Sequence, residues 1–237
     1  MTNYYFIIII LIILFLLRLT SFGSRFTNDY SYINDDTRRI CDTLYLFNEN
    51  EKIQIIDDFL SPNECNLLIK EAEMYSKKHG WKKDRHEEYP TTDNQFTKKW
   101  KNYSLIVKKI RTKIYSEIKK MFDIKEKKLE INEMFIVKYS TDGQRELEYH
   151  KDASEFSFII ALNDDYKGGG TYFKDMNENI KLKKGSILIF SGQNTHKGSY
   201  LEDGIRYILT GFIGYGGETI CQDYYRDIFN VNDLHII

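Results

Sequence analysis

Three residues in the second half of the chain have types and a spacing that fit a metal site. His150 and Asp152 stand two apart in "YHKDAS", directly before the apolar run "FSFIIALN". In an extended segment, residues two apart point to the same side. His196 follows in "SGQNTHKGSY", just past the apolar stretch "GSILIF". Two imidazoles and one carboxylate form the facial set that binds Fe(II) and leaves coordination positions open for other reactants.

Arg206 adds a second chemical feature. It lies ten residues after His196, at the start of "RYILTGF". A guanidinium inside a barrel needs an anionic partner, and a carboxylate in bidentate geometry is the usual one. The sequence offers no obvious acidic mate, so a dicarboxylate cosubstrate fits: its 2-oxo acid end chelates iron while its far carboxylate meets Arg206. A lone His-x-Asp is common in solvated turns, but the added histidine and arginine make a metal site the stronger interpretation.

Helices are expected before this region. "KIQIIDDFL" predicts a strand, and Ser61, Pro62 and Glu64 then form a capping-box pattern for a helix that runs to about Lys78. A loop from Trp81 to Asp93 follows, and we interpret it, with Gly168–Gly170, as a candidate wall of a peptide groove. A second helix is expected from about 98 to 122. It has one apolar stripe, formed by Tyr103, Ile106, Val107, Ile110, Ile114 and Ile118.

From Glu130 onward the pattern changes to short β-rich runs separated by Gly, Asn and Asp. Helices first and strands second indicate an α+β fold whose helices pack on one side of an antiparallel sandwich or barrel. "KGGG", which begins at Lys167, lacks the ending of a phosphate-binding loop and a following helix. It therefore predicts a tight turn between strands.

The N-terminus predicts membrane attachment. Residues 4–17 read "YYFIIIILIILFLL" without a charge, and extending the run to residue 22 makes it long enough to span a bilayer if the Arg18 side chain reaches back to the interface. We expect a transmembrane signal-anchor over 1–22 and a polar tether over 23–51. The folded domain would occupy 52–237, with a core of about 130–215. A cleaved signal peptide is the alternative. Arg18 and Arg25 follow the run, and the positive-inside rule then weakly favours a cytoplasmic C-terminal domain.

Composition excludes several classes of protein. Lys and Arg total 34 and Asp and Glu total 35, so no general nucleic-acid footprint is indicated. The Lys-rich segment from 98 to 128 is interpreted first as a solvated helix face, with an acidic partner as the alternative. Three well-separated cysteines, Cys41, Cys65 and Cys221, exclude a zinc ribbon and a dense disulfide scaffold.

The blocks around these residues resemble a known family. "HKDASEFSFIIALN", "YKGGGTYF", "KKGSILIFSG" and "THKGSYLEDGIRYILTGF" occur in the order found in the 2-oxoglutarate- and Fe(II)-dependent dioxygenases. In particular, these blocks resemble the procollagen prolyl 4-hydroxylases and lysyl hydroxylases. "RHEEYPTTD" resembles a loop of the lysyl hydroxylase relatives. The resemblance covers about residues 52–215 and leaves out both ends of the chain.

This resemblance implies a fold, a site and an activity. The fold would be a double-stranded β-helix, the jelly-roll of cupin-like proteins, with flanking N-terminal helices. His150, Asp152 and His196 would be the iron ligands, while Arg206 and Tyr139 would hold the distal carboxylate of 2-oxoglutarate. The cofactors would be Fe(II), 2-oxoglutarate and ascorbate (vitamin C).

The implied activity is hydroxylation, with dioxygen, of peptidyl proline or lysine in collagen-like or other proteins. Arginine at position 206 leans toward the lysyl enzymes, and the compact, membrane-anchored layout leans toward the prolyl ones. The family acts in the lumen of the endoplasmic reticulum, which implies a single-pass membrane protein with a lumenal domain. This conflicts with the cytoplasmic orientation that Arg18 and Arg25 weakly favour.

Two alternative functions remain: a nucleic-acid dealkylating oxygenase, which the membrane segment disfavours, and a non-catalytic membrane-tethered binding module. No nucleic-acid partner is expected.

Overall fold

The computed structural model describes residues 52–86, 89–124 and 128–215. Its first elements are strand β1 (Ile53–Ile56) and helix α3 (Pro62–His79). The predicted capping box is confirmed: the Ser61 side chain accepts the backbone N–H of Glu64, and the Glu64 carboxylate accepts the backbone N–H of Ser61. Proline occupies the first helical turn, where its missing N–H removes no intrahelical bond.

The second helical segment begins later than the sequence predicts and contains a π turn. It consists of α4 (Tyr103–Lys109), η1 (Ile110–Ile114) and α5 (Tyr115–Met121). Its core isoleucines recur every four residues and are fully buried: Ile106, Ile110, Ile114 and Ile118. In a pure α-helix such a stripe drifts by about 40° per step, because four residues exceed one turn of 3.6. The wider π turn offsets that drift and keeps the stripe facing the sheet.

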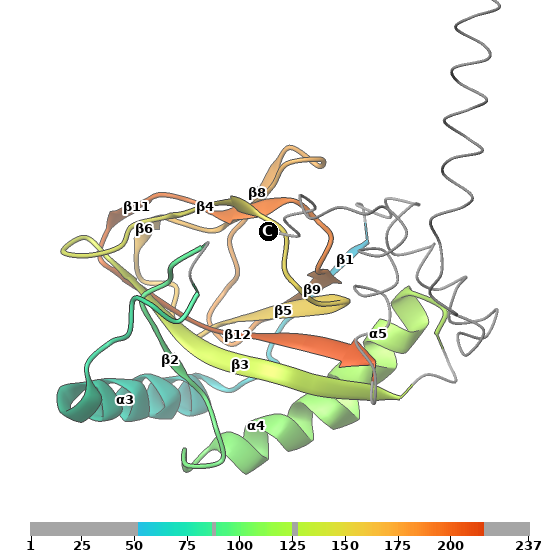
Figure 1. Ribbon diagram of the computed structural model, residues 1–237, viewed down its shortest axis with the longest axis horizontal. Helices are drawn as coiled ribbons and strands as arrows, with labels where there is room; N and C mark the ends of the chain where they lie inside the picture. The colour runs from blue at the N-terminus through green and yellow to red at the C-terminus, as the bar shows by residue number, and fades with distance from the viewer. Residues whose placement is uncertain (1–51, 87–88, 125–127, 216–237) are drawn as a thin grey trace, which may run out of the picture. The chain divides into compact units, whose positions relative to one another are not determined.

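A six-stranded antiparallel sheet carries the core, in the order β1-β9-β5-β12-β3-β2. Its long central pair is β3 (Leu129–Ser140) and β12 (Ile205–Tyr215). The other members are β2 (Asp93–Gln95), β5 (Phe156–Ala161) and β9 (Ile187–Ser191). The helices lie along one face of this sheet, and the smaller strands lie on its other side (Figure 1).

The two faces of the six-stranded sheet bury different cores, because side chains alternate along each strand. Met134, Ile136 and Leu209 pack in the cluster that includes the helix isoleucines. Phe135, Val137 and Ile208 pack on the opposite face, in a cluster shared with the smaller sheets. The strands are therefore apolar on both faces, and the few polar side chains on the inner face stand out.

The smaller strands cover that inner face. One sheet has the order β4-β10-β7-β8, formed by β4 (Leu147–His150), β10 (His196–Gly198), β7 (Thr171–Phe173) and β8 (Glu178–Ile180). The other pairs β11 (Leu201–Asp203) with β6 (Lys167–Gly168). The predicted turn at "KGGG" joins β6 to β7, and Gly168, Gly169 and Gly170 all have positive φ. The α+β, jelly-roll prediction is confirmed.

Several sequence predictions concern residues outside the described ranges. The signal-anchor over 1–22, the tether over 23–51 and the tail after 215 lie there, as do Cys41 and Cys221. Cys65 is a free, buried thiol. Among the described helices, none is both long and apolar enough to cross a membrane.

Candidate metal centre

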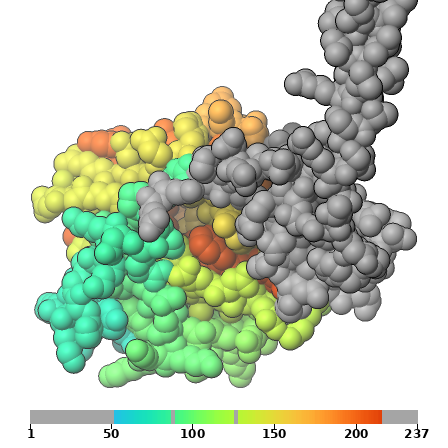
Figure 2. Space-filling model, viewed as in Figure 1, coloured from blue at the N-terminus to red at the C-terminus, as the bar shows by residue number. Residues whose placement is uncertain are grey.

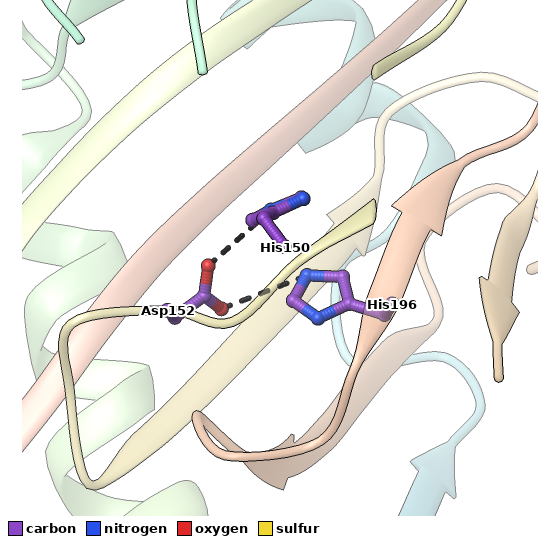
Figure 3. Close-up of side chains that lie close together, drawn as sticks. All are labelled: His150, Asp152 and His196. Carbon is purple, nitrogen blue, oxygen red and sulfur yellow. Dashed lines mark ion pairs between the residues drawn. The ribbon is translucent and has the colours of Figure 1, made fainter. Parts of the chain in front are cut away.

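The structure brings His150, Asp152 and His196 to one point. His150 ends β4 and pairs across the strands with His196, the first residue of β10. Asp152 lies in the segment that follows β4. One carboxylate oxygen of Asp152 lies 3.5 Å from Nε2 of His150 and the other lies 3.7 Å from Nε2 of His196. The three side chains point toward one another from two neighbouring segments (Figure 3).

Both imidazoles are oriented by backbone carbonyls. Nδ1 of His150 lies 2.8 Å from the carbonyl oxygen of Glu148, and Nδ1 of His196 lies 2.9 Å from that of Asn194. A carbonyl only accepts, so each Nδ1 carries the proton and each Nε2 keeps its lone pair. The two lone pairs face the carboxylate, which is the arrangement of metal-ligating histidines.

The spacing of the donor atoms fits a single ion. The three ligand atoms all lie within 4.8 Å of one another. Donor atoms that bind one ion at about 2.1 Å lie about 3 Å from one another. The three donor atoms here therefore need to move only slightly closer together to coordinate a single ion. The donor set, two neutral nitrogens and one carboxylate, suits Fe(II) and leaves an open side. The residues present therefore fit the ferrous ion that the sequence resemblance implies.

Asp152 is held in place by its own contacts. The hydroxyl of Ser157 donates to Asp152 Oδ2 at 2.5 Å, and the backbone N–H of Asp152 donates to the carbonyl of Gly192 at 2.8 Å. The carboxylate is buried together with Ser154 and Ser157. Because the serine hydroxyl donates to Oδ2, it makes no hydrogen bond to Oδ1. The two bonds also keep the carboxylate directed at the imidazoles.

Burial keeps His196 neutral. Desolvation lowers its pKa to about 4, and the neighbouring His150 acts in the same direction, while Asp152 opposes the shift. At neutral pH the imidazole is therefore unprotonated at Nε2 and available as a ligand without first releasing a proton.

The centre opens into a cavity of about 280 Å³. In the space-filling view a hollow is visible with atoms of β12, in orange-red, at its floor (Figure 2). Residues from three parts of the chain line it: positions 86, 89 and 91 of the loop before β2, the inner face of β3 and β12, and the segments that carry the three metal-site residues. They include His86, Tyr89, Thr91, Phe135, Val137, Tyr139, His150, Asp152, Thr171, His196, Arg206, Ile208, Thr210 and Phe212.

Arg206 lies inside this cavity without an acidic partner among the described residues. It is only 4% exposed, and its Nε is buried with no hydrogen-bond partner. Its nearest polar contact is Nη2 to Oγ1 of Thr171, at 3.4 Å. The guanidinium also lies 5.3 Å from the ring centre of Tyr139, its cross-strand neighbour. A buried guanidinium without an anionic partner costs free energy. A carboxylate bound at this end of the cavity would satisfy it.

Tyr139 and Thr171 complete that end. Burial raises the pKa of Tyr139, so its phenol stays a hydrogen-bond donor at neutral pH. Tyr139 was expected here from the sequence, whereas Thr171 was not. Its only sequence signal is its position directly after the three glycines. The Trp81–Asp93 loop does line the cavity, but the sequence did not single out His86, Tyr89 or Thr91 within it.

The two-histidine, one-carboxylate centre within a jelly-roll is the ligand set of mononuclear non-haem iron sites. No family model matches the chain. The chain is 32% identical over 169 residues to procollagen-lysine,2-oxoglutarate 5-dioxygenase 1 of Rattus norvegicus. That match covers 63% of this chain and 22% of the relative, so the chain spans less than a quarter of that enzyme.

Solved structures agree on the fold. A viral collagen prolyl hydroxylase from Paramecium bursaria Chlorella virus-1, solved as a 2OG complex, matches with a TM-score of 0.55 and 20% identity. The match covers 70% of this chain and 96% of the viral one. A prolyl-4-hydroxylase from Pseudomonas putida matches with a TM-score of 0.57 and 13% identity, over 76% of this chain and 99% of that one. Over the shared region, the chain is therefore similar in sequence to part of a procollagen-lysine dioxygenase and similar in fold to two prolyl hydroxylases.

Proposed function

We propose that this protein is a 2-oxoglutarate- and Fe(II)-dependent dioxygenase that hydroxylates proline or lysine in a polypeptide substrate. The observation that carries the proposal is the convergence of His150, Asp152 and His196 in the same cavity as the unpaired guanidinium of Arg206. The names of the sequence relative and of the structural neighbours support a peptidyl substrate over a nucleic acid.

The overall reaction balances as R–H + 2-oxoglutarate + O₂ → R–OH + succinate + CO₂. When bound at the three ligands, Fe(II) with 2-oxoglutarate supplies the activation of dioxygen that is coupled to this oxidative decarboxylation. Arg206 would bind the far carboxylate of 2-oxoglutarate with charge-assisted hydrogen bonds, and Tyr139 and Thr171, which lie beside the guanidinium, would add a phenol and a hydroxyl donor.

The remaining contributions of the chain are orientation and exclusion of water. The carbonyls of Glu148 and Asn194 fix the two imidazoles, and the hydroxyl of Ser157 fixes the carboxylate. Val137 and Ile208, which pair between the Tyr139–Arg206 and Phe135–Thr210 positions, give the middle of the cavity an apolar wall. A reactive centre shielded in this way favours oxidation of the bound substrate over side reactions with water.

Mass spectrometry tests the proposal. The full chain is incubated with Fe(II), 2-oxoglutarate and ascorbate and with collagen-like peptides that contain proline, lysine or both. We expect one residue type to gain one oxygen atom, and Asp152→Ala to abolish both this gain and succinate formation while the fold is retained. Peptide binding without any oxygen gain or succinate would instead identify a non-catalytic binding module.

We further propose a membrane location and a need for ascorbate. The apolar run of residues 4–17, within the expected anchor over 1–22, supports single-pass attachment, and the family resemblance supports a lumenal domain in an endoplasmic-reticulum-type membrane. Alkaline carbonate extraction should leave the full chain with membranes, whereas release into the supernatant would contradict attachment. Protease protection of residues 52–237 in sealed vesicles tests orientation. Omission of ascorbate should lower the number of turnovers.

A further inference from the structure

The two helical segments share an outer surface, formed by residues 61–79 and 98–121, whose exposed charges have one sign. We call it the helix surface. Ten cationic side chains are exposed on it: Lys70, Lys77, Lys78, Lys98, Lys99, Lys101, Lys108, Arg111, Lys113 and Lys120. The same residues include four acidic side chains, and none of these four is exposed. The helix surface is therefore strongly positive, although the chain as a whole has a formal net charge of −1.

The four acids of these segments are used inside the fold. Each is half-buried and bonds to a partner: Glu64 to Lys109, Glu71 to Asn102, Glu73 to Lys138 and Glu117 to Gln54. These carboxylates are turned toward the junction of the helices or toward the sheet, so they do not neutralise the exposed lysines. An anionic partner from outside the fold would.

Large apolar side chains are exposed among these cations. Leu67, Met74 and Leu105 are 44%, 61% and 42% exposed. Positions 67 and 74 are seven apart and so lie on one face of α3. The bonds that Glu64 and Glu71 make join α3 to the start of the second helical segment, and they bracket positions 67 and 105. The two leucines therefore face each other across the junction of the helices.

Apolar side chains surrounded by lysines match a lipid bilayer that contains anionic headgroups. The apolar side chains enter the interface, while the lysine stems lie along them and the ammonium groups reach the phosphates. A solvated helix face, the first interpretation from the sequence, explains the lysines but not the two leucines and the methionine. An acidic polypeptide would match the charges as well.

The chain itself favours the bilayer over an acidic polypeptide. The proposed anchor over residues 1–22 would be joined to the described domain by residues 23–51, which span at most about 100 Å when fully extended. A membrane would therefore always lie within reach of the helix surface. Such tethering makes even weak surface contacts effective, because the second contact becomes intramolecular.

We propose that the helix surface docks the domain onto a bilayer that contains anionic lipid. The inference adds an interaction surface to the proposed membrane location and does not depend on the catalytic reaction. The helices pack on one face of the six-stranded sheet, and the metal centre and its cavity lie on the other face (Figure 1). Docking through the helices would therefore leave the cavity clear of the lipid and open to a polypeptide in solution.

Lysine acetylation at low reagent concentration, read by peptide mass spectrometry, tests the docking. The full chain is reconstituted into vesicles of phosphatidylcholine alone, or of phosphatidylcholine and phosphatidylserine in equal amounts. We expect the exposed lysines of the helix surface to react more slowly in the mixed vesicles only, and raised salt to restore their reactivity. Lys167, Lys174 and Lys181, which are exposed on the strands of the other side, should react equally in both.

Two pairs of variants separate the charges from the apolar residues. Lys70→Gln with Lys108→Gln should lower the docking equilibrium constant about 30-fold, because each lysine near an anionic surface contributes a factor of about five. Lys174→Gln with Lys181→Gln is the matched control and should dock like the wild type. Met74→Glu should weaken docking, whereas Ile205→Glu, at a 40% exposed apolar position on β12, should not. All four variants should keep the Tm of the wild type.

Equal reactivity of the helix-surface lysines in both kinds of vesicle would overturn the inference, as would protection that neither the lysine pair nor Met74→Glu reduces. Protection without anionic lipid would assign the surface to a second copy of the chain. Protection by soluble polyglutamate but not by mixed vesicles would assign it to an acidic polypeptide. A chain that transfers no oxygen to any peptide yet shows the expected protection would refute the proposed function and leave this inference standing.

Discussion

Replacing Arg206 by methionine should separate stability from cosubstrate binding. The guanidinium is 4% exposed and lacks an acidic partner among the described residues. Without 2-oxoglutarate, the folded state carries an unpaired buried cation, whose unsatisfied groups cost about 1–3 kcal/mol. Methionine has similar length and no charge, so Arg206→Met should stabilise the cosubstrate-free protein by about that amount. For a chain of this size the increase in Tm would be about 2–12 °C.

The same substitution should abolish stabilisation by 2-oxoglutarate. At about 100 times its dissociation constant, a ligand stabilises the native state by about 2.7 kcal/mol. Scanning calorimetry under anoxic conditions with Fe(II), with and without 2-oxoglutarate, measures both effects. The wild type should gain Tm with 2-oxoglutarate, while Arg206→Met should start higher and gain nothing. A variant that melts lower than the wild type and still responds to 2-oxoglutarate would refute the reasoning.

Three further predictions follow from individual contacts. Ser157→Ala removes the hydroxyl that holds Asp152 and should weaken Fe(II) binding about 10- to 100-fold, measured by anoxic titration, with Tm nearly unchanged. Ile114→Ala, in the fully buried helix stripe, should lower the free energy of unfolding by about 2–5 kcal/mol in denaturant titrations and leave the KM for 2-oxoglutarate unchanged; an altered KM would count against the separation of the two cores. Burial raises the pKa of Glu155 to about 7, so the folded state favours the protonated carboxyl. Stability from this group is complete below the ordinary pKa of 4.5 and is lost as pH rises through about 7, by at most about 3 kcal/mol. Glu155→Gln should flatten the fall in Tm between pH 5 and 8, and an unchanged slope would contradict this.

The elements that the sequence predicted correctly have local causes. The capping box at Ser61 depends on three neighbouring residues, and the β-runs after Glu130 depend on short apolar, β-rich stretches separated by Gly, Asn and Asp, so both can be predicted without tertiary information. The start of the second helix could not be placed, because Lys98 and Lys99 are good helix formers in isolation. In the structure, residues 98–102 form turns, and the Asn102 amide and the Lys101 backbone N–H both bond to the carboxylate of Glu71.

Some residues of the site could likewise be predicted from the sequence, and others could not. The ligand types and the spacing of His150, Asp152 and His196 suggested one centre, and the cross-strand pairing of the two histidines explains why residues so far apart in sequence meet. Thr171 could not be assigned from spacing. Its contact with Arg206 depends on which strand lies opposite that arginine in the folded chain.

The most direct test of the central claim is an anoxic titration of the full chain with Fe(II) in the presence of 2-oxoglutarate, followed by the visible charge-transfer absorption of a ferrous 2-oxo acid chelate. The account predicts a band that saturates at one Fe(II) per chain. It should be absent in His150→Ala and Asp152→Ala, and Arg206→Met should need far more 2-oxoglutarate to form it. A band of full intensity in Asp152→Ala, or no band in the wild type, would contradict the assignment of these residues to one iron centre.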